Sequence, residues 1–518
     1  MNLGKHPAIT LILFLVLLTR IVIVLTVFHT TRTDLLEQFY WDADPKIYVA
    51  GARHILDTGV NRLNFFPPLH FLFLAGCLYL GKGNLLIAAL ANVTVGWLTV
   101  VGIYLLAKDL YGERAGLIAA IISGFYPNFI IYEIALYPEP LALLWIVFSF
   151  LMLARYFQTC GSSYLVGGGF LWGLASQTRG GLNYFPVFAG IAIAASLAGR
   201  SWKSRCKPMS TFLLAAYLAF LAMGIAAYPL HGNFSFNSKS GIGSVLHGAN
   251  RITTSCTDYG DVRGKLFYSI LKDEWPEGSQ IYSRELLNLD ARQIGVKLLR
   301  FIAQDPLTYV KNAFTKLSCL WSPNQLIIYY LKTTGFKDAD RPIVNGVCLG
   351  IGLLYMLIVC GGLYGLSRAR GPFRLLFLLF IFYYTVLIFL SIGNSKLRLP
   401  LMPFFIVYCS YGITRLRDLF RGTPYAHTWI TLIMVAIFTG NSIYKCREFL
   451  PSPAEVDVRE IELSYELGFP GTALHLLKKG HKHPFSGDQK KRMSTVEKNA
   501  LSKLEISQRL EPVNGIGR

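Results

Sequence analysis

Long apolar runs separated by short polar turns recur along this chain from residue 8 to residue 445. A helix needs about 20 consecutive apolar residues to cross the hydrocarbon core of a bilayer. The pattern therefore predicts an all-α polytopic membrane protein with about eleven spans. The predicted spans are residues 8–29, 84–107, 115–134, 138–157, 164–177, 182–199, 211–230, 344–367, 375–392, 398–414 and 427–445.

A shorter apolar run, residues 69–80, follows the pair Pro67-Pro68. As a helix it would rise only about 18 Å, so we expect it to lie half-buried at the membrane interface. The distribution of cations supports this choice, because cytoplasmic loops are rich in Lys and Arg. With the N-terminus inside, the cytoplasmic loops hold Lys108, Arg114, Arg155, Arg200, Lys203, Arg205, Lys207, Arg368, Arg370, Arg374, Arg415, Arg417 and Arg421, and the short outer loops hold Arg179, Lys396 and Arg398.

This topology predicts four regions. Residues 1–230 form a membrane module whose first outer loop is 30–68, and residues 344–445 form the C-terminal spans. Residues 231–343 form a mixed subdomain on the outer face, Gly- and Asn-rich at first and then helical. The charged tail 446–518 also lies outside; its part 457–480 is expected to be helical and its last 30 or so residues disordered.

Composition agrees with a membrane protein. The chain is 53% hydrophobic and only 15% charged, against about 25% charged residues in soluble domains. The formal net charge of +20 is explained by cytoplasmic loops that contact anionic lipid, so no nucleic-acid partner is expected. The nine cysteines form no CxxC pair; Cys256 and Cys446 could form a disulfide if both face the outside.

Candidate chemistry begins in the first outer loop, YWDADPKIY, which carries Asp42 and Asp44. Tyr48 follows Asp44 by four residues, so the two share a helix face. Asp44 could simply cap the helix that Pro45 begins. Two acids flanked by aromatic residues also suit catalysis on a lipid-bound substrate, and both interpretations can hold together.

A second acidic site is the turn IYEIALYPEP, with Glu133 and Glu139. Glu139 near a helix N-terminus could complement the helix dipole. Alternatively, Glu133 and Glu139 could hold a divalent metal ion, or Glu139 could orient an acceptor. The cations of the outer loops, Arg179, Lys396 and Arg398, either anchor the chain at the interface or bind a phosphate. For Arg20, inside the first span, we expect a bundle-facing or snorkelling position rather than contact with substrate.

The order of these motifs resembles the multi-spanning GT-C glycosyltransferases. It resembles especially the bacterial protein-mannosyltransferase-like branch, which includes the lipid A aminoarabinose transferases. The similar stretches over residues 8–200 are the D-x-x-x-Y-x-x-x-A-R loop from Asp44 to Arg53, the Pro-Pro pair, YLLAKDLYGERAGLIAA, FYPNFIIYEIALYPEPLALL and GLASQTRGGLNYFP. Further similar stretches are GIGSVLHGANRITTS and NSKLRLPLMPFFIVYCSYG.

The resemblance implies a GT-C-like membrane architecture and an enzyme that uses a polyprenyl- or dolichyl-phosphate-linked sugar on the outer face, with inversion at the anomeric carbon. It implies Asp44 as the catalytic residue, with Asp42 as the rival if the register shifts by two, and Glu139 as the second acidic residue. The family's Asp-Glu pair in the first loop is absent, because Pro45 follows Asp44. Tyr48, Arg179, Lys396 and Arg398 would then contact the substrate.

We therefore expect a membrane glycosyltransferase, a hexosyl or pentosyl transferase, in the bacterial inner membrane with its active site outside. Its partners would be the lipid-linked donor, membrane lipids and a glycan, glycolipid or protein acceptor. The alternatives are a transporter or flippase of lipid-linked sugars and a non-catalytic scaffold. The chain has no second half that repeats the first, as many transporters have, and its acids lie at one face rather than at the membrane midplane.

Overall fold

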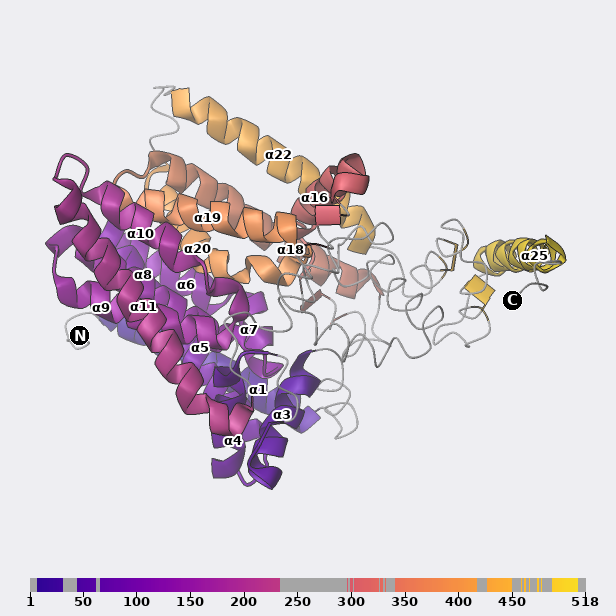
Figure 1. The fold of residues 1–518 in the computed structure, drawn as a ribbon, viewed down its shortest axis with the longest axis horizontal. Coiled ribbons are helices and arrows are strands. Elements are labelled where there is room, and N and C mark those ends of the chain that lie inside the picture. Colours follow the sequence, from indigo (N-terminus) through magenta and orange to yellow (C-terminus); the bar gives the residue numbers. More distant parts are fainter. Residues whose placement is uncertain are drawn as a thin grey trace, which may run out of the picture. The chain divides into compact units, whose positions relative to one another are not determined.

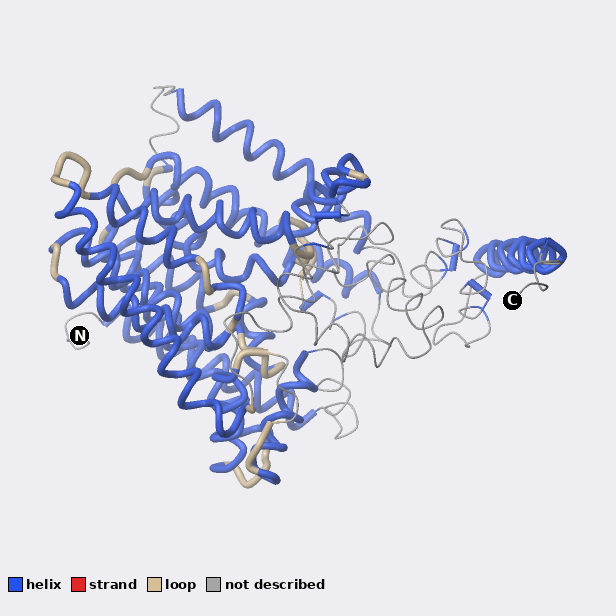
Figure 2. Tube along the Cα trace, viewed as in Figure 1, coloured by secondary structure: helices blue, strands red, loops and turns tan. Residues whose placement is uncertain are grey.

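The computed structural model describes residues 7–30, 44–61, 66–232, 302–325, 341–416, 426–449 and 487–510, with a few single residues between these ranges. The chain divides into two compact units. The first contains Met1–Gly241, Gln325–Leu387 and Lys396–Gly440; the second contains Ile242–Asn324, Ile388–Ser395 and Asn441–Arg518. The described residues are helical with short connections and contain no β-strand (Figures 1 and 2).

The helices of the first unit occur in two groups along the chain. The N-terminal group contains α1 (Pro7–Thr30), α3 (Asp44–Thr58), α4 (Pro68–Leu80), α5 (Leu85–Tyr111), α6 (Glu113–Gly124), α7 (Pro127–Ile134), α8 (Glu139–Thr159), α9 (Ser162–Thr178), η2 (Gly180–Leu182), α10 (Phe185–Ser196) and α11 (Trp202–His231). The later group contains α18 (Arg341–Arg368), α19 (Pro372–Leu390), η4 (Ser395–Leu401) and α20 (Met402–Thr414), and α22 (Ala426–Phe449) begins in this unit.

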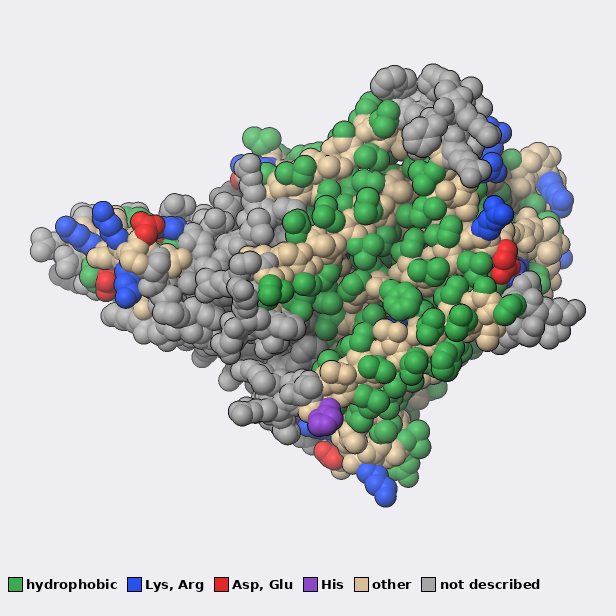
Figure 3. Space-filling view, turned by 180° about the vertical axis from the view of Figure 1, so that it is seen from behind, with side chains coloured by type: hydrophobic (Ala, Val, Ile, Leu, Met, Phe, Trp, Pro, Cys, Tyr) green, Lys and Arg blue, Asp and Glu red, His purple; other side chains and the backbone are tan. Residues whose placement is uncertain are grey.

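Among the described residues, seven helices are long and apolar enough to cross a membrane: Pro7–His29, Leu85–Tyr111, Glu139–Thr159, Trp202–His231, Ile343–Arg368, Pro372–Leu390 and Ser395–Thr414. Their outward side chains are apolar, for example Phe14 on α1 and Leu214 on α11, which are 60% and 61% exposed. Figure 3 shows such side chains covering a broad face of these helices. The predicted fold class, an all-α polytopic membrane protein, is confirmed.

The predicted number of eleven spans is not confirmed. The predicted span 115–134 consists of two helices, α6 and α7, bent by 50°, and counting this pair as one span raises the number of candidates to eight within the described part of the chain. The break lies at Gly124-Phe-Tyr-Pro127, because proline cannot continue the preceding helix. Predicted spans 164–177 and 182–199 correspond to α9 and to a shorter helical segment, Gly180–Ser196.

Aromatic packing joins the two groups of helices. Phe150 of α8 packs in a tilted arrangement against Phe404 of α20 at a centroid distance of 4.1 Å, and Phe185 of α10 lies 4.6 Å from both Trp172 of α9 and Phe380 of α19. Such ring pairs contribute about 0.5–1.5 kcal/mol each beyond their burial. This core packs α8 against α20, and both α8 and the η4 segment that leads into α20 carry predicted site residues.

Close helix packing depends on glycine at one contact in particular. A Cβ atom on Gly173 of α9 would lie 2.6 Å from the carbonyl oxygen of Ala216 on α11. Small residues at such positions let membrane helices approach each other closely. The end of α9, where Arg179 lies, is therefore held against α11.

In the second unit, α16 (Pro306–Leu320) packs on the segment 388–395. Tyr309 Oη and Lys316 Nζ both donate hydrogen bonds to the carbonyl oxygen of Phe389, at 3.2 and 3.3 Å. Cys319 of α16 is disulfide-bonded. The sequence suggested a disulfide between Cys256 and Cys446, and the side chains of both lie outside the described part.

The tail differs from the expectation of disorder. Residues Gly487–Leu510 form helix α25. Its apolar positions Met493 and Val496 pack against Val458, Ile461 and Ala473, all in the second unit. Apolar residues at helical spacing within a charged sequence give this segment a face to bury, which outweighs its polar composition. The predicted boundaries of the outer subdomain and of the tail fall largely on residues outside the described ranges and stay predictions.

Candidate active site

The segment between α1 and α4 contributes helix α3, which begins at Asp44. Its buried residues Tyr48, Ala52 and Ile55 follow helical spacing and pack on Phe71 and its neighbours in α4. The Asp44 carboxylate faces another part of the chain, where its Oδ2 accepts a hydrogen bond from Lys396 Nζ at 2.5 Å. Asp44 therefore both begins a helix and forms an ion pair, as the two interpretations of the sequence allowed.

Tyr48 lies one turn after Asp44 and is only 3% exposed. Its ring stacks on Phe66 and meets the edge of His70, each at a centroid distance of 4.9 Å. Burial, followed by the negative charges of Asp44 and Glu139, raises the pKa of the Tyr48 phenol well above its usual value. Tyr48 therefore keeps its proton and can act only as a neutral hydroxyl.

Glu139 begins α8 directly after Pro138 and is 3% exposed. Its Oε1 lies 3.2 Å from Nη1 of Arg179, the residue that ends α9. Its Oε2 is buried and makes no hydrogen bond to the described residues. A buried carboxylate oxygen without a partner costs free energy, so it points to a group that arrives from outside the chain.

The two ion pairs lie close enough to act on each other. Glu139 interacts electrostatically with Lys396 and Asp44 in addition to Arg179. Lys396 in turn interacts with Glu139 and Arg179. The structure thus brings together five predicted residues from α3, α8, the end of α9 and η4. Two of the four ionic side chains are acidic, Asp44 and Glu139, and two are basic, Lys396 and Arg179. Their net charge is therefore zero.

Three other predicted site residues are not part of these two ion pairs: Arg398 and Glu133 have other partners, and Asp42 is not among the described residues. Arg398 is 1% exposed and stacks over the ring of Tyr355, 4.1 Å from its centroid. Glu133 is 1% exposed and forms a buried ion pair with Arg20. Asp42 lies outside the described residues.

The described carboxylates do not fit a divalent metal ion. Such an ion takes several oxygen ligands. Asp44 instead faces Lys396, Glu139 faces Arg179 and Glu133 faces Arg20. Over the described ranges, no group of three or more His, Cys, Asp or Glu side chains could hold a metal ion. We therefore derive no step that requires one.

Sequence reasoning missed His70, which is fully buried beside the site. Its Nε2 lies 2.9 Å from the carbonyl oxygen of Leu136, in the turn that leads to Glu139. Burial lowers the pKa of His70 to about 4, so its ring is neutral near pH 7. A polar residue in the apolar run that follows Pro67-Pro68 was the signal that could have identified it.

Comparison with known proteins finds a family model that matches part of the chain. Residues 66–225 match the family model described as dolichyl-phosphate-mannose-protein mannosyltransferase. The resemblance to the GT-C glycosyltransferases is thereby confirmed over that region, which includes His70, Glu139 and Arg179. The match does not extend to Asp44 or to Lys396.

Similar solved structures come from an archaeal enzyme. The oligosaccharyltransferase AglB from Archaeoglobus fulgidus, in complex with an inhibitory peptide and a dolichol-phosphate, is 14% identical, with a TM-score of 0.44. The alignment covers 94% of this chain and 62% of AglB, so the chain spans about six-tenths of that enzyme. The apo form of the Archaeoglobus fulgidus oligosaccharyltransferase is 13% identical, with a TM-score of 0.43 and coverage of 92% and 61%. No protein with a curated description matches significantly.

Proposed function

We propose that this protein transfers a sugar, a hexose or a pentose, from a polyprenyl- or dolichyl-phosphate carrier to an acceptor hydroxyl, with inversion. The observation that carries the proposal is the pair of adjacent ion pairs, Asp44–Lys396 and Glu139–Arg179. A glycosyl phosphate needs cations for its leaving group and a base for its acceptor, and these pairs contain both.

The four charges suggest how the donor would enter the site. Without substrate, each cation is neutralised by a carboxylate. A donor phosphate competes for Lys396 and Arg179, because both bind phosphate oxygens strongly. Lys396 would then leave Asp44, so binding of the donor would free the carboxylate for its role as a base.

The reaction balances with these groups alone. The acceptor oxygen attacks the anomeric carbon from the face opposite the phosphate, while Asp44 takes the hydroxyl proton. The bond from the anomeric carbon to the phosphate oxygen breaks, and its electron pair stays on that oxygen. Lys396 and Arg179 stabilise the charge that develops there. The free Oε2 of Glu139 and the Tyr48 hydroxyl can orient the acceptor or the sugar.

Chain order supports an outer-face orientation. From Cys319 the chain runs through α18 and α19, both candidate spans, before it reaches Lys396. Two crossings return the chain to the side on which it started, so Cys319 and Lys396 would lie on one side. Disulfides persist in oxidising compartments such as the bacterial periplasm. We therefore propose that the site lies on the outer face, and the family resemblance suggests the bacterial inner membrane. The acceptor would be a glycan, a glycolipid or a protein.

The test compares the wild type with Asp44→Asn in lipid vesicles supplied with a panel of radiolabelled polyprenyl-phosphate sugars. Candidate acceptors are identified by comparing mass spectra of glycans and glycolipids from cells with and without the protein. Asp44→Asn should lower transfer by about 10²–10⁴-fold, the range for loss of a general base. The control is Asp109→Asn, which removes another paired aspartate, held by Arg155 at 2.9 Å, and should transfer normally. Movement of labelled donor across the vesicles without a new glycosidic bond would instead support a flippase.

A further inference from the structure

The break between α6 and α7 is held by a residue from α1. Arg20 is fully buried, and its Nε and Nη2 donate to the carbonyl oxygen of Gly124 at 3.2 and 3.1 Å. Nη2 also donates to the carbonyl oxygen of Ser123 at 3.0 Å. These two carbonyl groups end α6, where a helix has no partners of its own and favours a positive charge.

The same guanidinium also reaches the far end of α7. Its Nη1 pairs with Oε1 of Glu133, so one side chain connects both helices across the 50° bend. The pair fits against α5 because residue 96 is glycine; a Cβ atom there would lie 2.8 Å from Arg20 Nη1 and would collide with the Glu133 carboxylate. Asn92 of α5 adds a hydrogen bond from its Nδ2 to the Glu133 carbonyl oxygen, at 3.2 Å.

Between Glu133 and Glu139 the chain makes one tight turn. Leu136 has a φ of 54°, a left-handed conformation that non-glycine residues rarely adopt. His70 holds the Leu136 carbonyl oxygen at 2.9 Å, and the Tyr137 amide donates to the Tyr132 carbonyl oxygen at 3.2 Å. The turn is therefore fixed at several points, and a shift of α7 would be passed on to Glu139.

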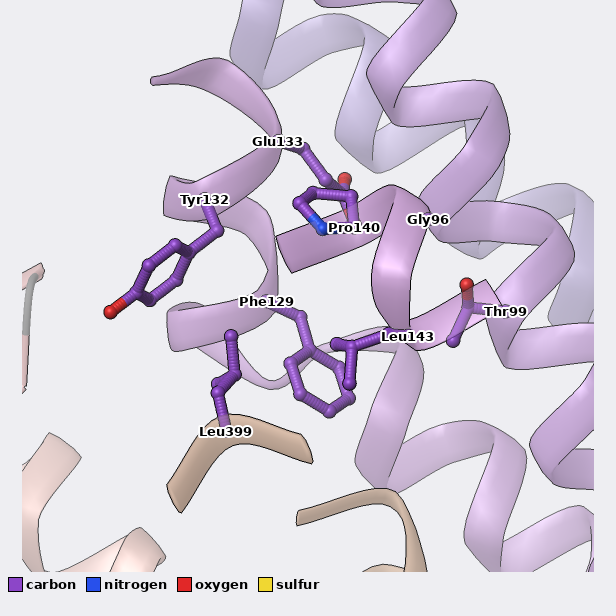
Figure 4. A pocket seen from close by; sticks show the side chains of 8 residues that line it. All are labelled: Gly96, Thr99, Phe129, Tyr132, Glu133, Pro140, Leu143 and Leu399. Carbon is purple, nitrogen blue, oxygen red and sulfur yellow. The ribbon is translucent and has the colours of Figure 1, made fainter. Parts of the chain in front are cut away.

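Side-chain packing leaves a small cavity beside this segment. A cavity of about 10 Å³ lies beside Glu133 and Pro140, the residue after Glu139, and is also lined by Thr99 and Leu143 (Figure 4). Its volume is near the lower limit for holding one water molecule. Glu133 Oε2 is buried and makes no hydrogen bond to the described residues. The polar contacts thus hold α7 where side-chain packing leaves a gap.

We infer that Arg20 is a positioning residue for the candidate active site: by joining α6, α7 and Glu133, it sets the place of Glu139 and hence of Arg179. This inference rests on the proposed transferase function. Arg20 lies inside the first predicted span and touches none of the four site charges, so it acts through Glu139. A displacement of a catalytic group by about 1 Å can cost about 10²-fold in rate.

The test is the double variant Arg20→Met/Glu133→Gln. Changing both partners avoids a buried charge without a counterion, which would destabilise the fold. We expect kcat to fall by about 10–100-fold with little change in KM for the donor. In a Glu139→Gln background, the Arg20→Met/Glu133→Gln change should lower kcat little further. The two sets of substitutions both act through the side chain of residue 139, so their effects should not add. The matched control, Arg155→Met/Asp109→Asn, neutralises the ion pair between α5 and α8 and should keep kcat.

Two further measurements test the role of Arg20 without the double variant or without an activity assay. Gly96→Ala keeps both charges but displaces the pair, and it should lower kcat in the same way if the double variant fails to fold. Amide hydrogen exchange over residues 125–139, relative to α9, should accelerate in either variant, and this readout needs no activity. A wild type that transfers no sugar would refute the proposed function, while the exchange data would still decide the positioning. Unchanged kcat, a full additional loss in the Glu139→Gln background, or unchanged exchange would overturn the inference.

Discussion

Replacing Lys396 by methionine should affect the rate far more than the stability. Lys396 Nζ lies 2.5 Å from Asp44 Oδ2, but the two side chains are 20% and 29% exposed. Partly exposed ion pairs contribute only about 0–1 kcal/mol to stability, because solvent screens them. A donor aimed at charge that develops in a transition state contributes about 10²–10³-fold to kcat, or about 3–4 kcal/mol.

The assay measures initial rates of sugar transfer at saturating donor, together with the melting temperature of the purified protein in lipid nanodiscs. A charge exchange, Asp44→Lys/Lys396→Asp, provides the comparison. It restores an ion pair of the same two charges but puts the base and the phosphate-binding cation in each other's places. We expect near-normal melting and a loss of transfer at least as large as that of Lys396→Met.

The reasoning would be refuted if Lys396→Met retained wild-type kcat, or if the charge exchange restored transfer together with stability. Either result would mean that the Asp44–Lys396 ion pair only stabilises the fold and takes no part in the reaction. The leaving phosphate would then depend on Arg179 alone.

Three further predictions concern single residues. Tyr48→Phe keeps the buried ring and removes only the hydroxyl, so transfer should fall about 10-fold or more while melting changes little, since one neutral hydrogen bond contributes about 1 kcal/mol. Gly173→Ala places a Cβ atom 2.6 Å from the Ala216 carbonyl oxygen and should lower the melting temperature, whereas Gly167→Ala, with its nearest neighbour at 3.8 Å, should not; equal melting of the two would contradict the packing argument. Cys319→Ser should remove a disulfide and cost about 2–5 kcal/mol, visible as a lower melting temperature without reductant, whereas the exposed free thiol Cys160 can be changed to serine without effect.

The sequence predicted those parts of the site that depend on short-range spacing. Asp44 and Tyr48 lie one helical turn apart, and Glu139 and Arg179 lie at the ends of neighbouring helices, so their positions follow from periodicity and loop order. The choice between Lys396 and Arg398 could not be predicted in this way. The two lie two residues apart on η4, and only the three-dimensional packing directs Lys396 to Asp44 and Arg398 to Tyr355.

The division of one predicted span into α6 and α7 could partly be predicted from the sequence. Gly124 and Pro127 mark a break, but an apolar run that continues across them hides it. The role of Arg20 was not readable, because its partners Ser123, Gly124 and Glu133 lie more than 100 residues away. A buried cation is explained only when its partners are known.

The separation of Asp44 and Lys396 has a consequence for biosynthesis. The two residues are 352 positions apart, and the chain is made from the N-terminus. Asp44 leaves the ribosome long before Lys396, and during this time Asp44 has no counterion from η4. The pair of Asp44 and Lys396 can therefore form only after α19 and η4 have been made. A chain that stops before residue 396 carries the region that matches the family model but lacks Lys396, so we expect truncated products to remain inactive even when they insert correctly.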